Sequence, residues 1–150
     1  MTASRLKDFL DEEHVKYVTI GHSPAFTAQE IAATAHIPGK ELAKTVVVKI
    51  DGEMAMVVEP ANAKVDFEVL KKACGSDQVE LASEFEFQDR FPGCELGAMP
   101  PFGNLYDMVV YIAEPLTQKD EISFNAGTHS ELVKMSYQDY ASLVNPNVLP

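Results

Sequence analysis

Lys44 is the residue of this 150-residue sequence whose position most favours a chemical role. It stands where the chain enters a long apolar run, so its ammonium group would lie beside a core that excludes water. An ammonium group in such a place can bind an anion or stabilise the negative charge that develops in a reaction. The alternative is a surface lysine that packs its stem along a strand and keeps its charge in solvent. The residues alone leave both interpretations open.

The other residues with useful chemistry are scattered along the chain. The four histidines form no metal-ligand pattern, and neither Cys74 nor Cys94 has a base at a spacing typical of a thiol nucleophile. The sequence also lacks a Gly-x-Gly-x-x-Gly fingerprint, a Walker loop, a His-Glu-x-x-His pair and a Gly-x-Ser-x-Gly elbow. We therefore expect no metal site and no organic cofactor.

A β-hairpin is the element that must position Lys44. Apolar, β-rich runs at 44–50 and 53–60 flank the dipeptide Asp51-Gly52. An Asp-Gly pair between such runs favours a type I′ turn, in which both central residues have positive φ. Both faces of the two runs are largely apolar, so we expect the hairpin to lie in the interior of a sheet rather than at its edge.

Helix signals divide the rest of the chain. Asp66 and Gly75 are expected to cap a helix at 67–74. Ser83 opens a helix that runs to about residue 91, Ser136 opens a closing helix, and a capping box at 27–30 opens one that ends near residue 36. These elements and the strands between them follow no regular βαβ alternation. We predict a single α/β domain over residues 1–150, with a mixed sheet or small barrel-like sheet surrounded by helices.

Composition limits the classes of partner. The chain has 23 acidic and 12 basic residues, and a net charge of −11 argues against a protein that coats nucleic acid, so we expect no DNA partner. Residues 40–72 contain six basic and six acidic residues, which makes the hairpin region the least repulsive to an anion. There is no apolar run near the ~18 residues of a membrane helix, no apolar signal core and no disulfide framework. We expect a cytoplasmic protein that does not associate with membranes.

A long loop at 93–104 contains three glycines and two prolines, which fix an unusual backbone path. Such loops often carry binding sites, although a plain connector is the alternative. Together with Lys44 and the polar loop at 127–130, this loop outlines a candidate pocket.

Several segments resemble motifs of the YbaK family, also called the prolyl-tRNA-synthetase-associated domain. The run Lys44-Thr45-Val46-Val47-Val48-Lys49, followed by Asp51-Gly52, resembles the family's signature strand. Gly97-Ala98-Met99-Pro100-Pro101-Phe102-Gly103 resembles its Gly-x-x-x-Pro-Phe-Gly loop. Asn125-Ala126-Gly127 and the early segment from His22 to Phe26-Thr27 are similar to it as well. The motifs follow the family's order, and the similarity runs from about Val15 to Leu143.

This resemblance implies an activity and a set of site residues. Members of the family are mostly aminoacyl-tRNA deacylases, which hydrolyse the ester of a wrongly attached amino acid. The family's essential lysine corresponds to Lys44, which is therefore implied as the catalytic residue. The residues implied in substrate binding are His22, Thr45, Gly97, Met99, Pro101, Phe102, Gly103, Gly127 and His129. Met99-Pro100-Pro101 departs from the Ser-Pro loop common in cysteine-clearing members, which argues against cysteine specificity.

We expect from the resemblance a free-standing trans-editing deacylase, since 150 residues leave no room for a synthetase. Its substrate would be a small amino acid, such as Ala, Cys, Ser or Thr, esterified to a tRNA. The acceptor end of the mischarged tRNA would contact Lys44, with Lys40 and Lys49 as further phosphate contacts. An aminoacyl-tRNA synthetase or elongation factor is a candidate protein partner. Two alternatives stay open: a non-catalytic module that binds an amino acid or nucleotide, and a regulatory domain that acts through a partner protein.

Overall fold

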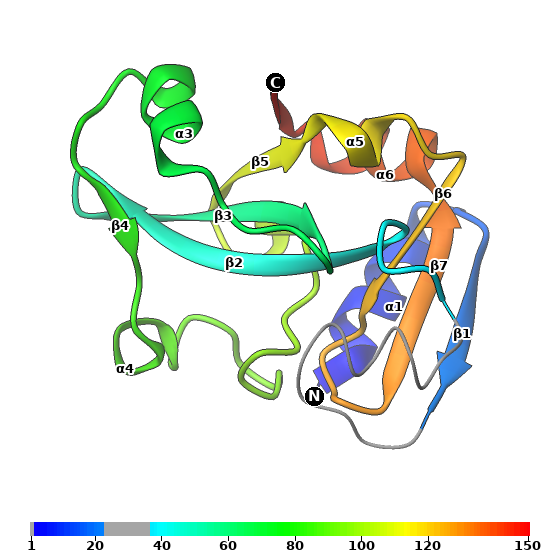
Figure 1. The fold of residues 1–150 in the computed structure, drawn as a ribbon. Coiled ribbons are helices and arrows are strands. Elements are labelled where there is room, and N and C mark those ends of the chain that lie inside the picture. Colours follow the sequence, from blue (N-terminus) through cyan, green and yellow to red (C-terminus); the bar gives the residue numbers. More distant parts are fainter. Residues whose placement is uncertain (1, 23–36) are drawn as a thin grey trace.

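The expected hairpin forms the centre of the sheet. In the computed structural model, which describes residues 2–22 and 37–150, β2 (Leu42–Ile50) and β3 (Glu53–Pro60) pair in antiparallel register (Figure 1). Asp51 and Gly52 have φ values of 53° and 86°, as a type I′ turn requires. The predicted hairpin and its interior place in the sheet are both confirmed.

Among the described residues, eight strands form one mixed sheet, in the order β1-β7-β6-β2-β3-β5-β8, with β4 paired to β2 off this path. Strand β2 runs parallel to β6, and β3, β5 and β8 run parallel to one another, while the other pairs are antiparallel. The mixed sheet with helices is therefore confirmed. The remaining strands are β1 (Tyr17–Gly21), β4 (Val79–Leu81), β5 (Val109–Ala113), β6 (Glu121–Asn125), β7 (Glu131–Ser136) and β8 (Asn147–Leu149).

Local signals set the helix boundaries. The carboxylate of Asp66 accepts hydrogen bonds from the second and third amides of the helix it caps, and Gly75 ends that helix with a φ of 71°. Ser136 caps the closing helix in the same way. The described helices are α1 (Thr2–Glu12), α3 (Phe67–Cys74), α4 (Glu84–Phe87), α5 (Glu114–Thr117) and α6 (Tyr137–Val144), with a 3₁₀ turn at Gly103–Leu105.

Some boundaries differ from the predictions. The capping box at Ser83 forms as expected, but α4 ends at Phe87 and not near residue 91. Phe87 and Phe91 are both buried in the core, with their rings 6.0 Å apart in an edge-to-face contact. Helix α5 and strand β8 were not predicted. The predicted capping box at 27–30 and its helix lie outside the described residues.

The two faces of the hairpin have different surroundings. Ala43 and Val47 pack in the main core with Phe102 and Phe124, whereas Val48, from the opposite face of β2, packs in a cluster with Leu70 of α3. Figure 1 shows α3 on one side of the hairpin and the segment that contains α4 on the other. Among the described helices, none is long and apolar enough to cross a bilayer.

Candidate active site

Two glycine-containing loops that are distant in the sequence are joined by backbone hydrogen bonds. The amide of Glu95 donates to the carbonyl of Gly127 at 2.8 Å, and the amide of Gly127 donates to the carbonyl of Ala98 at 2.9 Å. The loop at 95–98 therefore lies directly against the β6–β7 connection. The structure brings together two of the three parts of the pocket outlined from the sequence.

Glycine is required at the point where these loops meet. Gly97 has a φ of 87°, and a Cβ built on it would lie 3.3 Å from Cε1 of His129. Gly127 has a φ of 99°, which also favours glycine. The amide of Gly97 donates to the sulfur of Met99 at 3.1 Å, so the backbone at Gly97 is held by a contact within its own loop. A bare backbone thus faces the imidazole of His129.

His129 is fixed by the opposite loop. Its backbone amide donates to Oε1 of Glu95 at 2.6 Å, and its ring Nε2 lies 2.8 Å from the carbonyl oxygen of Leu96. A carbonyl only accepts, so this ring contact requires the proton on Nε2. Glu95 was missed in the sequence because it belongs to no motif and its partner is 34 residues away. His22 lies near the same connection, since its amide donates to the carbonyl of Ser130 at 2.9 Å.

The second half of the 97–103 loop is buried. The hydroxyl of Tyr140 donates to the carbonyl of Pro101 at 2.7 Å, and the ring of Phe102 packs edge-to-face on Tyr140 with centroids 5.2 Å apart. A Cβ on Gly103 would lie only 2.2 Å from the carbonyl oxygen of Met108. Pro101, Phe102 and Gly103 are therefore placed as supports that fix the loop on the core.

Lys44 and Thr45 lie directly after the point at which β2 stops pairing with β6. The two strands pair in parallel at only two positions, the second being Ala43 with Phe124. The pairing ends one residue before Lys44 on β2 and one residue before Asn125, the last residue of β6, which is two residues before Gly127.

Two oxygen atoms near this point are buried without a hydrogen bond. Within residues 2–22 and 37–150, neither Oγ1 of Thr45 nor Oδ1 of Asn125 has a hydrogen-bond partner. Buried polar atoms are normally paired, and an unpaired one calls for an explanation such as a missing ligand or water. Thr45 shares its strand face with Ala43 and Val47, on the side of the main core. Lys44 points to the other face.

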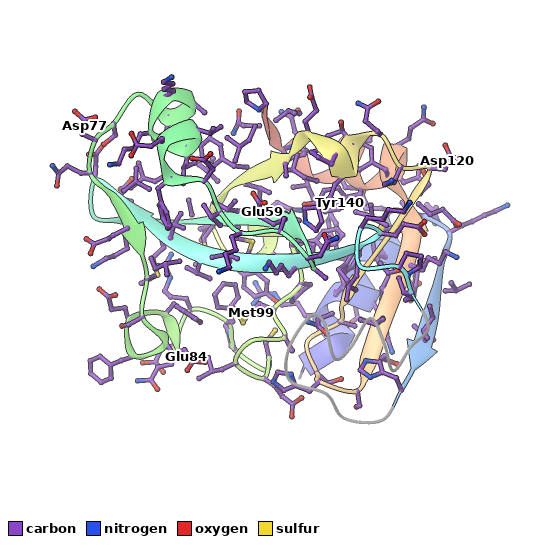
Figure 2. The ribbon with its side chains drawn as sticks, viewed as in Figure 1. Glu59, Asp77, Glu84, Met99, Asp120 and Tyr140 are labelled. Carbon is purple, nitrogen blue, oxygen red and sulfur yellow. The ribbon has the colours of Figure 1, made fainter. Side chains whose placement is uncertain are left out.

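On that face Lys44 lies directly opposite Glu59 in the β2–β3 register. Glu59 is only 7% exposed, and burial raises its pKa while the charge of Lys44 opposes the shift. Figure 2 shows Glu59 and Met99 on opposite sides of β2, in agreement with the alternation along the strand. The sequence analysis missed Glu59, whose only signal was a carboxylate at the end of an otherwise apolar strand.

Lys49, which we expected as a further phosphate contact, is engaged by carboxylates of the protein itself. Its ammonium group forms a short ion pair with Glu86 and lies 3.9 Å from a carboxylate oxygen of Glu80. This hydrogen bond from Lys49, together with that from the Ser83 amide, lowers the pKa of Glu86 to about 2. The charge of Lys49 is therefore neutralised within the protein.

The fold and these loops define an editing domain for aminoacyl-tRNA. The chain belongs to the aminoacyl-tRNA editing domain family, which matches residues 22–143, and the resemblance drawn from the sequence motifs is confirmed. Lys44, Thr45 and both glycine loops lie within the matched region.

Curated relatives agree with this family. The chain is 26% identical over 155 residues to the multifunctional Ser/Thr-tRNA deacylase ProXp-y of Escherichia coli strain K12, covering 99% of this chain and 92% of the relative. It is 26% identical to the prolyl-tRNA editing protein ProX of Acetoanaerobium sticklandii, covering 92% of this chain and 87% of the relative. It also matches the proline–tRNA ligase of Staphylococcus saprophyticus subsp. saprophyticus at 39% identity, over 50% of this chain and 13% of the ligase.

Solved structures show the same fold. Hypothetical protein APE2540 superposes with a TM-score of 0.86 at 19% identity, covering 96% of each chain. A candidate trans-editing enzyme for prolyl tRNA synthetase superposes with a TM-score of 0.80 at 21% identity, covering 97% of this chain and 93% of that one. At these identities the likeness establishes the fold alone.

Proposed function

We propose that this protein is a trans-editing aminoacyl-tRNA deacylase, which hydrolyses the ester between a tRNA and a wrongly attached small amino acid. The observation that carries the proposal is the match of residues 22–143 to the editing-domain family. The joined glycine loops support it, because they present bare backbone and a fixed imidazole next to the end of β6.

The proposed chemistry is electrostatic. Lys44 lies near the start of β2, on the face opposite Met99, so we assign its ammonium group to the terminal phosphate of the acceptor end, whose negative charge it stabilises. The backbone at Gly97 and Gly127 approaches the aminoacyl group closely, with His129, Met99 and His22 around it. Water is the nucleophile, and we assign its activation to a ribose hydroxyl of the substrate. Pro101, Phe102 and Gly103 keep the loop in place.

A hydroxylated amino acid is the substrate that the site favours. Oγ1 of Thr45, on the main-core face of β2, is a buried acceptor that a ligand's hydroxyl or ammonium group would satisfy. The relative ProXp-y is a Ser/Thr-tRNA deacylase, which supports serine and threonine esters ahead of alanine and cysteine. The macromolecular ligand is then the acceptor end of mischarged tRNA in the cytoplasm, delivered with or without a synthetase or elongation factor.

Deacylation of a panel of mischarged tRNAs tests the proposal. We expect hydrolysis of seryl or threonyl esters by the native protein, loss of activity in Lys44→Ala, and little change in its melting temperature. Lys134→Ala is the matched control, because Lys134 is a lysine already paired with Glu121. A protein that binds these tRNAs but hydrolyses none of them would be the non-catalytic module. A fully active Lys44→Ala variant would refute the mechanism.

Thiol or metal chemistry is the competing mechanism. Burial raises the pKa of the Cys94 thiol, although the Tyr106 hydroxyl and Arg5 oppose the shift, so this cysteine is not an activated thiolate. The part of the chain that the structure describes contains no group of three His, Cys, Asp or Glu residues able to hold a metal ion. We expect Cys74→Ser/Cys94→Ser protein, and native protein treated with a chelator, to keep their activity.

A further inference from the structure

We propose that Glu59 is a positioning residue that acts through Lys44, holding its ammonium group on the sheet in the place that deacylation needs. The inference rests on the proposed function and adds to it a residue outside the recognised motifs. Glu59 is not expected to touch the substrate.

The register of the hairpin carries the argument. Lys44 and Glu59 are directly opposite each other in the antiparallel β2–β3 pair, so their side chains leave the same face of the sheet. Cross-strand neighbours of this kind have Cβ atoms roughly 4.5–5.5 Å apart. On the other side of β2, the pairing with β6 ends one residue before Lys44, at Ala43 and Phe124.

Burial makes the carboxylate dependent on this lysine. Glu59 is 7% exposed and follows the apolar run from Met54 to Val58. An ionised carboxylate in such surroundings is costly unless a cation or several hydrogen bonds accompany it. Lys44 is the cation that faces it across the strand pair, and the charge of Lys44 opposes the burial-driven rise of the Glu59 pKa.

Other charged groups near Glu59 do not replace Lys44. Glu59 lines a cavity of about 190 Å³ together with Lys64 and Asp66 from the loop before α3, Glu114 from α5, and the last residue, Pro150. Asp66 is engaged as the cap of α3 and its charge raises the Glu59 pKa, while Lys64 and Glu114 are exposed. The surroundings therefore raise the pKa of Glu59, and the charge of Lys44 opposes that rise.

Two consequences follow for the reaction. Lysine has a flexible four-carbon stem, so a fixed carboxylate beside it reduces the positions that Nζ can occupy. A displacement of a reacting group by about 1 Å can cost on the order of 100-fold in rate.

Protonation of Glu59 removes the negative charge that positions Lys44. Because the folded-state pKa of Glu59 is raised, this charge is lost at a higher pH than for an ordinary glutamate. The acid limb of the kcat profile should therefore belong to Glu59.

Glu59→Gln tests the inference with little change of shape, and Glu53→Gln is its control at the exposed start of the same strand. On the tRNA that the native protein deacylates, we expect Glu59→Gln to lower kcat by roughly 10- to 100-fold, with KM nearly unchanged and the acid limb removed. Glu59→Asp should recover part of the activity, and Glu53→Gln should behave as native. Native kcat and pH profile in Glu59→Gln, or an equal loss in Glu53→Gln, would overturn the inference.

A second measurement does not depend on activity. NMR spectra of ¹³C-labelled lysine side chains, with the Lys44 signal assigned from its absence in Lys44→Ala, report the surroundings of the Lys44 ammonium group. We expect the Cε chemical shift of Lys44 to change in Glu59→Gln and to stay native in Glu53→Gln. An unchanged Lys44 signal in folded Glu59→Gln would overturn the pairing. Native protein that hydrolyses none of the esters would instead refute the proposed function, and the NMR result would still decide whether the pair exists.

Discussion

Gly97 and His129 face each other so closely that an added Cβ would require the imidazole to give by a few tenths of an ångström. A Cβ on Gly97 would lie 3.3 Å from Cε1 of the imidazole, whose Nε2 is held 2.8 Å from the carbonyl of Leu96. The ring cannot move away without lengthening that contact. The pair therefore sets the width of the site at the point where the two loops meet.

Gly97→Ala should distinguish an effect on the kinetics of the site from an effect on the stability of the fold. A non-glycine residue at positive φ costs about 1–2 kcal/mol, and at Gly97 the methyl group would also push His129. Gly75→Ala is the matched control, because Gly75 has a φ of 71° and open space around the added Cβ. We expect both variants to lose similar stability in urea unfolding, but only Gly97→Ala to raise KM or lower kcat. Equal kinetics in the two variants would make the loop a plain connector.

Tyr140→Phe should weaken the support beneath the same loop. The Tyr140 side chain is fully buried, and this burial raises the pKa of its hydroxyl. The hydroxyl donates to the Pro101 carbonyl at 2.7 Å, so Tyr140→Phe leaves that carbonyl unpaired. A buried group left unsatisfied costs about 1–3 kcal/mol. The control is Tyr137→Phe on the partly exposed neighbour. Urea denaturation checks the difference, and similar midpoints for both variants would contradict it.

Local signals in the sequence predicted the parts of this fold that are decided within a few residues. The Asp51-Gly52 turn and the caps at Asp66 and Gly75 depend on backbone conformations and hydrogen bonds that only neighbouring residues provide. Strand β8 has three residues, Asn147–Leu149, and exists because it pairs with β5. No period or cap can reveal such an element, since its partner is far away in the sequence.

The site residues also divide into those that local motifs predict and those that only distant contacts reveal. The glycines at 97 and 127 belong to recognisable motifs, so the sequence could propose them. Glu95 and Glu59 belong to none, and their places follow from contacts across 34 residues and from strand register. In the sequence Glu59 is simply a charged residue before a proline, and only pairing with β2 reveals that it is buried opposite Lys44.

The Lys49–Glu86 pair predicts how stability changes in acid. The hydrogen bond from Lys49 and that from the Ser83 amide lower the pKa of Glu86 from 4.5 to about 2. Because the folded-state pKa lies below the unfolded value, the ionised group stabilises the fold at neutral pH. That contribution is lost as the pH falls from about 4.5 towards 2.

Glu86→Gln measures this contribution, with Glu84→Gln as an exposed control on the same helix. We expect the melting temperature of Glu86→Gln to fall below native at pH 7 and the difference to shrink steadily below pH 4.5. Glu84→Gln should show no such pH-dependent difference. A gap between native and Glu86→Gln that stays constant from pH 7 to pH 2.5 would contradict the assignment.

The surface charge predicts how this acidic chain handles tRNA. The net charge is −11, and several lysines are already paired with carboxylates. Lys7 lies 2.9 Å from Glu131, Lys134 lies 3.5 Å from Glu121, and Lys49 is bound to Glu86. A phosphate that approached any of these lysines would have to displace its carboxylate partner. A broad phosphate footprint is therefore not expected, and contacts should be confined to the acceptor end near Lys44 and Lys40.

A salt titration of tRNA binding by the whole protein tests this expectation. Each phosphate contact releases counterions, so few contacts give a shallow dependence of log affinity on log salt, on the order of one to three ions. Lys44→Ala and Lys40→Ala should each reduce the slope by about one, whereas Lys134→Ala, which removes a lysine already paired with Glu121, should leave it unchanged. A slope above roughly six ions, or an equal effect of Lys134→Ala, would reveal an extended basic face and refute the acceptor-end arrangement.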